Sequence, residues 1–258
     1  MEKIQIESLY RYPVKGLTPE AVGRVALRAG QCLDWDRAFA LAHGDAPLDP
    51  ANPQWLAKSH FMCLLRNAGI ARLRVRFDEA VGVLHIALPG EGEVSASPFT
   101  RQGRAALGAF LVGVLGAQAR SGAEGQPPVF RYFERHHFTD EKEQLVSLIG
   151  LESLAALEAA VGGAREKLRF RANVYLRGGA PWAEFGWVGR RLRVGTAVLE
   201  VTERIGRCGA TSVNPLTGER DANPVKELFR HFGHTDLGVF ARVIEGGEVR
   251  AGNVVAAL

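Results

Sequence analysis

The sequence predicts a mainly β protein with a few helices, an α+β fold, and three observations support this class. Short runs that alternate apolar and polar residues fill most of the first 90 residues and return after residue 129, which is typical of half-buried strands. Three other segments carry apolar residues at helical spacing. The 30 glycines and 12 prolines punctuate these runs with turns. The first half alone is expected to form a small β-barrel or meander.

Composition limits the function classes. With 258 residues the chain fits one large domain or two small ones, and we divide it at 1–125 and 126–258. The net charge of +4 comes from dispersed residues, so no nucleic-acid partner is expected. The three cysteines lie far apart, which favours a reducing compartment. There is no leader-like or membrane-spanning apolar run, and we expect a cytoplasmic protein without a membrane partner.

Two basic residues, Lys15 and Arg37, lie at or near the first predicted strands. Residues 4–10 alternate as a strand, and the turn Tyr12-Pro-Val-Lys15-Gly16 follows. Lys15 on that turn either binds an anion or is simply solvated. A second strand is predicted over 21–27 and a third over 34–42, which places Arg37 among apolar residues. A buried arginine needs an anionic partner, and either a neighbouring aspartate or a ligand would serve.

The middle of the chain is predicted as a hairpin and a helix. Residues 44–53 form a loop and 55–67 a short helix or helix–strand junction. Residues 72–77 and 83–88 pair across a turn, and 100–115 form a helix with a cap and a proline before it. Residues 117–128, rich in Gly, Ala and Pro, are expected to be a flexible connection.

The second half alternates strands and helices. Residues 129–133 and 168–176 are predicted as strands, 150–161 and 223–232 as helices, and 181–187 as a loop. A strand over 168–176 would place Arg169, Arg171 and Asn173 on one face, where they could bind an oxyanion or a ring amide. His136 and His137 precede Asp140, but adjacent residues on a strand point to opposite faces, which argues against a metal site. Residues 237–245 and 249–257 are expected to form a final hairpin.

Cys208 is the principal candidate for chemistry. It lies between glycines in Gly206-Arg207-Cys208-Gly209, directly after residues 191–194 and the predicted strand 197–203. Glycines permit close approach of a ligand, and Arg207 supplies positive charge that favours a thiolate. The alternative is a buried cysteine that acts as a small apolar residue.

Four segments in order carry a family resemblance. They are Tyr12-Pro-Val-Lys15-Gly16, Asp36-Arg37-Ala-Phe39, Arg169-Phe-Arg171-Ala-Asn173 and the run from Arg207 to Gly218. Together they resemble the MOSC family, named for the C-terminal domain of molybdenum cofactor sulfurase, with its N-terminal β-barrel partner. Within that family the chain is similar to the mitochondrial amidoxime-reducing component and its bacterial counterparts. The resemblance implies two β-barrels, the second a MOSC barrel with peripheral helices.

The resemblance also implies a molybdenum–pterin cofactor (molybdopterin) whose metal is bound by one thiolate, at the position of Cys208. Thiolates suit this metal. The positions that match cofactor-binding residues of the family, listed here in chain order, are Lys15, Gly16, Arg37, Asp140, Arg171, Asn173, Arg207 and Thr211. Asp140 matches with a different spacing. Gly16 stands where many relatives have serine, and Ile205 stands where the amidoxime-reducing branch has a second cysteine.

The resemblance implies an oxidoreductase that reduces N-hydroxylated compounds such as hydroxylamines and amidoximes. The chain ends at Leu258 without the ferredoxin domain of some relatives, so electrons are expected from a separate protein, a ferredoxin or a cytochrome or flavin reductase. Two alternatives remain. One is a non-catalytic carrier of the cofactor, and the other is a sulfur carrier that bears a persulfide on Cys208.

Overall fold

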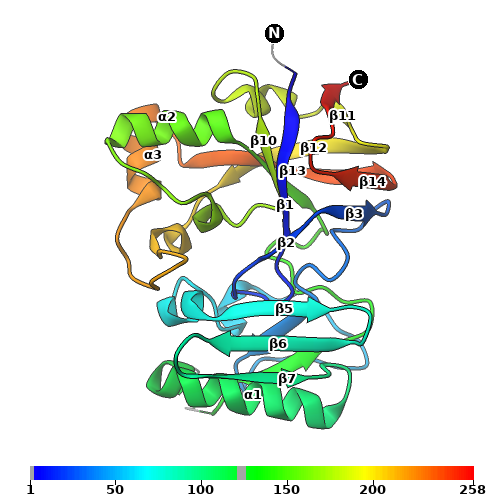
Figure 1. Cartoon of the computed structure of the whole chain (residues 1–258), viewed down its shortest axis with the longest axis vertical. Coiled ribbons are helices and arrows are strands. Elements are labelled where there is room, and N and C mark those ends of the chain that lie inside the picture. Colours follow the sequence, from blue (N-terminus) through cyan, green and yellow to red (C-terminus); the bar gives the residue numbers. More distant parts are fainter. Residues whose placement is uncertain (1–2, 121–125) are drawn as a thin grey trace.

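The computed structural model describes residues 3–120 and 126–258. The described residues form two parts, one above the other in Figure 1. The upper part contains an eight-stranded sheet with helices α2 (Leu151–Val161) and α3 (Pro224–Phe232) on one side. The lower part contains a three-stranded sheet and helix α1 (Arg101–Leu115). The mainly β fold with α-helices is therefore confirmed.

The upper sheet combines strands from both ends of the chain. Its order is β15-β11-β12-β13-β9-β10-β1-β2, and β9 and β10 are the one parallel pair. The strands are β1 (Gln5–Arg11), β2 (Glu20–Val22), β9 (Val146–Gly150), β10 (Val174–Arg177), β11 (Arg191–Val194), β12 (Ala197–Gly206), β13 (Asp236–Glu245) and β15 (Val255–Ala257). The pairing of β12 with β13 shifts register at three points. Such bulges bend a sheet, so the long strands can curl around the Val- and Leu-rich core.

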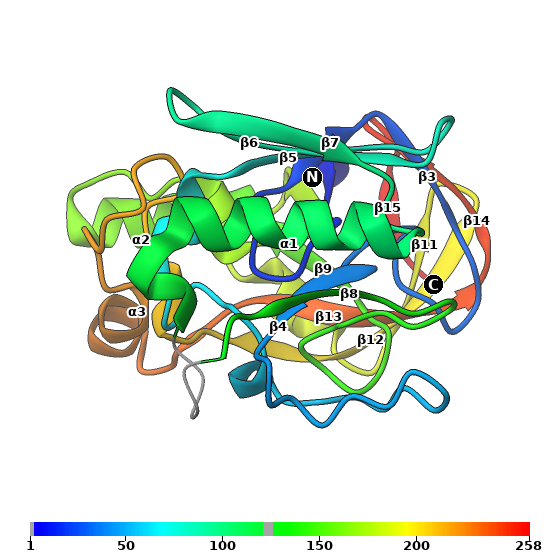
Figure 2. The same cartoon turned by 90° about the horizontal axis from the view of Figure 1, so that it is seen from below.

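The lower part has a separate core. Strands β5 (Arg74–Asp78), β6 (Val83–Leu88) and β7 (Gly92–Ala96) form one sheet, and β4 (Phe39–Ala42) pairs with β8 (Val129–Tyr132). Seen from below (Figure 2), helix α1 runs nearly along these strands, with β5–β7 on one side of it and β4 and β8 on the other. It buries Leu107, Leu111 and Leu115, four residues apart, and this spacing gives a helix one apolar face. The side chain of Thr100 accepts the Gly103 N–H at 3.0 Å and caps the helix.

The two parts exchange strands. β1 and β2 come from the first half of the chain but pair in the upper sheet, where β1 lies beside β10. β8 comes later but pairs with β4 in the lower part. The loops that follow β1 and precede β4 therefore lie where the upper and lower parts meet.

Several predicted elements are confirmed and others were wrong. The hairpin β5–β6, the strand predicted over 197–203 (within β12) and all three helices are present. The pairing of β11 with β12 was not predicted. The final hairpin is absent, because β13 pairs with β12 and β9 while β14 (Gly247–Arg250) pairs with β3 (Arg24–Leu27). The predicted strand 21–27 is divided at Gly23 between two sheets. These pairings join distant segments, which local alternation does not reveal.

Other boundaries also differ. The predicted strand 34–42 is a strand only over β4, because Trp35 and Arg37 have positive φ angles. Residues 55–67 hold one short 3₁₀ turn (Lys58–His60) and no α-helix. A 3₁₀ turn (Ala183–Trp187) lies in the predicted loop 181–187, and strand β7 was missed. Within the expected connection 117–128, a 3₁₀ turn (Gly116–Arg120) is present, and 121–125 lie outside the described residues.

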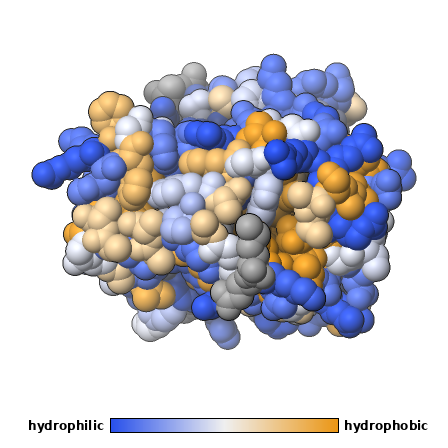
Figure 3. Space-filling model, turned by 90° about the horizontal axis from the view of Figure 1, so that it is seen from above, coloured by the Kyte–Doolittle hydropathy of each residue, from blue (hydrophilic) through white to orange (hydrophobic). Residues whose placement is uncertain are grey.

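The surface is mixed. Among the described residues no helix is long and apolar enough to span a bilayer. Figure 3 shows polar and apolar side chains interspersed over the upper face of the molecule, as is ordinary for a water-facing surface.

Candidate functional site

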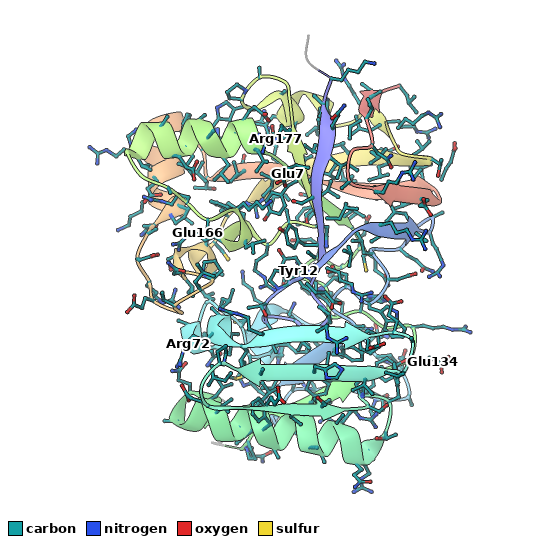
Figure 4. All side chains as sticks on the ribbon, viewed as in Figure 1. Glu7, Tyr12, Arg72, Glu134, Glu166 and Arg177 are labelled. Carbon is teal, nitrogen blue, oxygen red and sulfur yellow. The ribbon has the colours of Figure 1, made fainter. Side chains whose placement is uncertain are left out.

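A cavity of about 260 Å³ is lined by residues from both parts of the molecule. Every residue that the sequence singled out as a site residue lines it: Lys15, Gly16, Arg37, Asp140, Arg171, Asn173, Arg207, Cys208 and Thr211. Tyr12, at the end of β1, lies where the two parts meet (Figure 4). The strand exchange therefore brings the candidate residues together from five separate segments.

Lys15 is buried and fully engaged. Its Nζ donates to the carbonyl oxygens of Phe138 and Thr139, at 2.9 and 3.2 Å, and to Asp140 Oδ1 at 2.5 Å. Burial lowers the pKa of Lys15, and Asp140 opposes this shift. Burial acts to raise the pKa of Asp140, but Lys15 and Arg37 outweigh it, so that pKa lies well below its usual range. The Asp140 side chain is 53% exposed on the cavity side, so a charged carboxylate faces the cavity beside the lysine.

Arg37 and Arg171 differ in their counter-ions. Arg37 pairs with Asp36, which is buried, so one of the two partners considered from the sequence is present. Burial acts to lower the pKa of Arg37, but Asp36 outweighs it and the pKa is raised. Arg171 has no carboxylate partner among the described residues, and its Nη1 donates to the carbonyl of Leu17 at 2.7 Å. Burial lowers the pKa of Arg171. Arg171 is therefore a cation with unused donors facing the cavity.

The predicted strand over 168–176 was wrong. Residues Lys167–Phe170 form a 3₁₀ turn, Arg171 has a φ of 53°, and β10 begins only at Val174. The shared face of Arg169, Arg171 and Asn173 thus does not come from strand alternation. A turn with one left-handed residue brings all three to the cavity wall instead.

Asn173 has few free polar atoms. Its Oδ1 accepts from the amide and the hydroxyl of Ser147, at 3.2 and 2.8 Å, and its Nδ2 donates to the Tyr10 carbonyl at 3.2 Å. Asn173 is 1% exposed. It therefore joins β1 to β9 and shapes the cavity wall, with one N–H left for a ligand.

The Cys208 turn follows the end of β12. Cys208 is half-buried and precedes a 3₁₀ turn (Gly209–Ser212). The hydroxyl of Thr211 donates to the Cys208 carbonyl at 2.8 Å, so Thr211 stabilises the turn. Arg207 donates to the carbonyls of Leu237 and Phe170, both at 2.8 Å. Burial lowers the pKa of Arg207 to about 10, so this side chain stays cationic at neutral pH beside the thiol.

Two further arginines donate hydrogen bonds to the Cys208 turn. Arg169 donates to the carbonyls of Thr211 and Ser212, at 3.5 and 3.2 Å, and pairs with Asp221 at 2.6 Å. Arg220 donates to the Gly209 carbonyl at 3.1 Å and to the Leu65 carbonyl at 2.7 Å. The turn is thereby attached to the lower part. Sequence reasoning missed Arg220, for which its place in the turn-rich run after Cys208 was the only signal.

Gly16 is required by the backbone. Its φ is 83°, and a Cβ atom at this position would lie 2.8 Å from the Met62 carbonyl oxygen. A serine would therefore be strained and would clash here, which accounts for the glycine. Ile205, at the position of a second thiol in some relatives, is 6% exposed and lines the cavity as an apolar group.

The two adjacent histidines contact different neighbours. His137 Nδ1 lies 2.6 Å from the Asp36 carbonyl and 3.2 Å from Cys32 Sγ, whereas the His136 ring makes an edge-to-face contact with Phe138. Burial raises the pKa of the Cys32 thiol. Across residues 3–120 and 126–258, no cluster of three or more His, Cys, Asp or Glu side chains is arranged to hold a metal ion.

The arrangement suits an anion that carries a soft metal. Arg37, Arg171 and Arg207 line one cavity with a single half-buried thiol, Cys208. Arginine forks bind phosphate in a bidentate manner, and a thiolate is a ligand for soft metals. This combination of groups can hold a phosphate at one point and a metal at another.

The comparisons with curated proteins and solved structures found only distant similarity. A search of curated proteins gave no match. Solved structures with similarity include the YuaD protein from Bacillus subtilis, at 12% identity and a TM-score of 0.44, covering 98% of this chain and 94% of that one. YiiM from Geobacillus stearothermophilus (19% identity, TM-score 0.33) and YiiM from Escherichia coli (16%, 0.33) each cover 44% of this chain and 53% of their own. These values carry no conclusion about function.

The family matches cover most of the sequence. Residues 3–121 match the MOSC N-terminal β-barrel domain, and residues 134–256 match the MOSC domain. The cavity described above is lined from both segments. The chain therefore belongs to the MOSC family, in the form that joins a MOSC N-terminal β-barrel domain to a MOSC domain.

Proposed function

We propose that the protein binds a molybdenum–pterin cofactor in this cavity and reduces N-hydroxylated compounds with electrons from a separate protein. The observation that supports this most is the joint placement of Cys208, Arg37, Arg171 and Arg207 around one cavity. MOSC domains are associated with this cofactor in general. The similarity of the sequence motifs to the amidoxime-reducing component supplies the substrate class.

The residues present fit such a group. Arg171 and Arg207 have no carboxylate partner among the described residues, and both line the cavity. Buried cations without counter-ions are costly unless an anion binds them. In this proposal Arg171 and Arg37 hold the cofactor phosphate, Cys208 is the metal ligand, and Asn173 offers its remaining N–H. When bound, the metal would supply a two-electron redox centre that takes oxygen from the substrate.

The protein's own groups keep the site ordered. Thr211 and Arg169 donate hydrogen bonds within the turn that carries Cys208. These bonds order the turn and therefore fix the position of the thiol. Lys15 and Asp140, which also line the cavity, form an ion pair. This leaves the charges of Arg171 and Arg207 as the main attraction for an anion.

Elemental analysis tests the proposal. The protein is purified from a host that makes the cofactor, beside Cys208→Ala and Cys63→Ala. Cys63 is the matched control, because it also lines the cavity but stands in a different segment. We expect about one molybdenum per chain in the wild type and in C63A, and a large loss in C208A. Equal metal in all three, or none in the wild type, would refute cofactor binding through Cys208.

Activity separates the reductase from the two carriers. The loaded protein is mixed with an amidoxime and a chemically reduced viologen dye, and amidine is measured. Amidine formation in the wild type, lost in C208A, supports the reductase. Bound molybdenum without amidine would favour a cofactor carrier. A persulfide on Cys208 in the mass spectrum after incubation with a sulfur donor would favour a sulfur carrier.

A further inference from the structure

Two arginines of the cavity stack on one buried tyrosine. The Cζ atom of Arg37 lies 4.8 Å from the centre of the Tyr12 ring, and that of Arg171 lies 4.3 Å from it. Tyr12 is 0% exposed and follows β1 where the upper and lower parts meet (Figure 4). Tyr12 itself does not line the cavity, whereas both arginines do. One ring therefore contacts a cation from each half of the chain.

The backbone fixes the ring relative to both arginines. The Tyr12 amide donates to Asp36 Oδ1 at 2.7 Å, and the Tyr12 carbonyl accepts from the Arg37 amide at 2.7 Å. The Tyr12 hydroxyl donates to the carbonyl of Ala172 at 3.3 Å, next to Arg171. The ring is therefore attached to the neighbours of the two residues whose side chains it contacts.

Both arginines have an unusual backbone conformation. Each has a φ of 53°, a left-handed region that residues other than glycine rarely adopt. Such conformations persist only when surrounding contacts hold them, and they gather at functional sites. In this fold the same conformation, at two positions far apart in sequence, directs two guanidinium groups to one ring.

The repulsion between Arg37 and Arg171 needs a compensating interaction. Two cations close together repel each other, and only Arg37 has a carboxylate partner, Asp36. The face of an aromatic ring carries negative charge and attracts a guanidinium, with a larger effect when water is excluded. Tyr12 thus offers Arg171 an interaction that no carboxylate among the described residues provides.

We propose that Tyr12 is a positioning residue, whose buried ring holds Arg37 and Arg171 in place so that both face one anion in the cavity. This inference rests on the proposed function in one respect, which is that the proposed function identifies the anion as the cofactor phosphate. The ring does not touch the ligand. It acts by keeping the two side chains ordered before an anion arrives, which lowers the entropy lost on binding.

Graded fluorination of the ring tests this role. Tyr12→Phe is the reference, because it keeps the ring and loses only the hydroxyl. Phenylalanine with increasing numbers of ring fluorines is then introduced at position 12. Fluorine withdraws charge from the ring face but nearly preserves its shape, so these variants are expected to fold. Tyr12→Leu, which has no ring, serves as a further variant where it folds.

The measurement is the affinity for inorganic phosphate by calorimetry, with unfolding temperature recorded in parallel. We expect Tyr12→Phe to bind like the wild type and affinity to fall with each fluorine, by about tenfold in total, which corresponds to about 1.4 kcal/mol. Equal affinity across the fluorinated series would overturn the inference, as would a wild type that binds no phosphate. A purely structural role would change the unfolding temperature without this graded loss.

The same experiment separates this inference from the proposed function. The phosphate series is repeated in the Cys208→Ala background, which cannot bind metal through that thiol. A graded loss there would support the role of Tyr12 independently of any metal bound through Cys208. A graded loss together with a wild type that never contains molybdenum would support the role of Tyr12 and refute the cofactor proposal. Normal molybdenum content, together with equal phosphate affinity across the fluorinated variants, would support the cofactor proposal and refute the role of Tyr12.

Discussion

Arg169 and Arg171 stand two residues apart, yet their replacement is expected to have opposite effects. Arg169 is 4% exposed, pairs with Glu166 at 2.9 Å and Asp221 at 2.6 Å, and donates to two carbonyls of the Cys208 turn. Within the described residues the Arg171 side chain makes one hydrogen bond, to the Leu17 carbonyl, and it lines the cavity. We compare Arg169→Met with Arg171→Met, which remove the charge but keep an unbranched side chain.

The structure sets the size of each effect. Breaking a buried ion pair costs about 3–5 kcal/mol, but Glu166 and Asp221 are each 39% exposed, so about 2–3 kcal/mol is expected for Arg169→Met. This lowers the unfolding temperature by roughly 4 to 12 °C in a chain of this size. Arg171→Met removes a cation whose pKa burial already lowers, so stability stays within about 1 kcal/mol of the wild type or rises.

Phosphate affinity should show the reverse order. A hydrogen bond to a charged group contributes about 1.5–3 kcal/mol, so Arg171→Met should weaken phosphate binding by roughly 10-fold to 150-fold. Arg169→Met, measured below its unfolding temperature, should bind within a few fold of the wild type. Thermal unfolding and calorimetry on both variants give the two quantities. A stability loss in Arg171→Met as large as that in Arg169→Met would refute the division between a cavity cation and a structural one.

Two further predictions concern the frame of the site. Gly16→Ser is expected to destabilise the protein by about 1–3 kcal/mol in urea unfolding, through its φ of 83° and the contact with Met62. Gly30→Ser is the control, with a φ of 71° and open space, and equal losses would contradict the clash. Glu184 accepts from Ser153 at 2.8 Å at the start of α2, and burial raises its pKa above 4.5. The folded wild type therefore loses stability as pH rises from 4.5 through that raised pKa. The stability of Glu184→Gln relative to the wild type should increase over the same pH range, and parallel profiles of stability against pH would contradict this.

The local signals in the sequence were sufficient for elements whose contacts are close in sequence. The α1 cap at Thr100, the hairpin β5–β6 and the proline that begins α3 each depend on neighbouring residues. The partner of β14 could not be predicted in this way, because β3 lies at the other end of the chain. The alternation of apolar and polar residues along a strand is the same whichever strand pairs with it, so it does not identify the partner.

The candidate site shows the same limit. The residue types at 15, 37, 171 and 208 were found from charge, turn chemistry and motif order, and they line one cavity. Whether they bind the cofactor stays a prediction. The left-handed backbone of Arg37 and Arg171 was missed, because φ depends on tertiary contacts such as those of Tyr12. Tyr12 stood in the first motif, but its contact with Arg171 joins segments far apart in the chain.

The exchange of strands between the two parts has a consequence for biosynthesis. β1 leaves the ribosome first, but its partner β10 follows more than 150 residues later, so the early strand waits with an unpaired edge until most of the chain has been translated. The cavity wall, which needs segments from near Lys15 to Thr211, is likewise completed only late in synthesis. A ligand for this cavity would therefore bind after assembly of the whole chain, and a truncated product would have no complete site to fill.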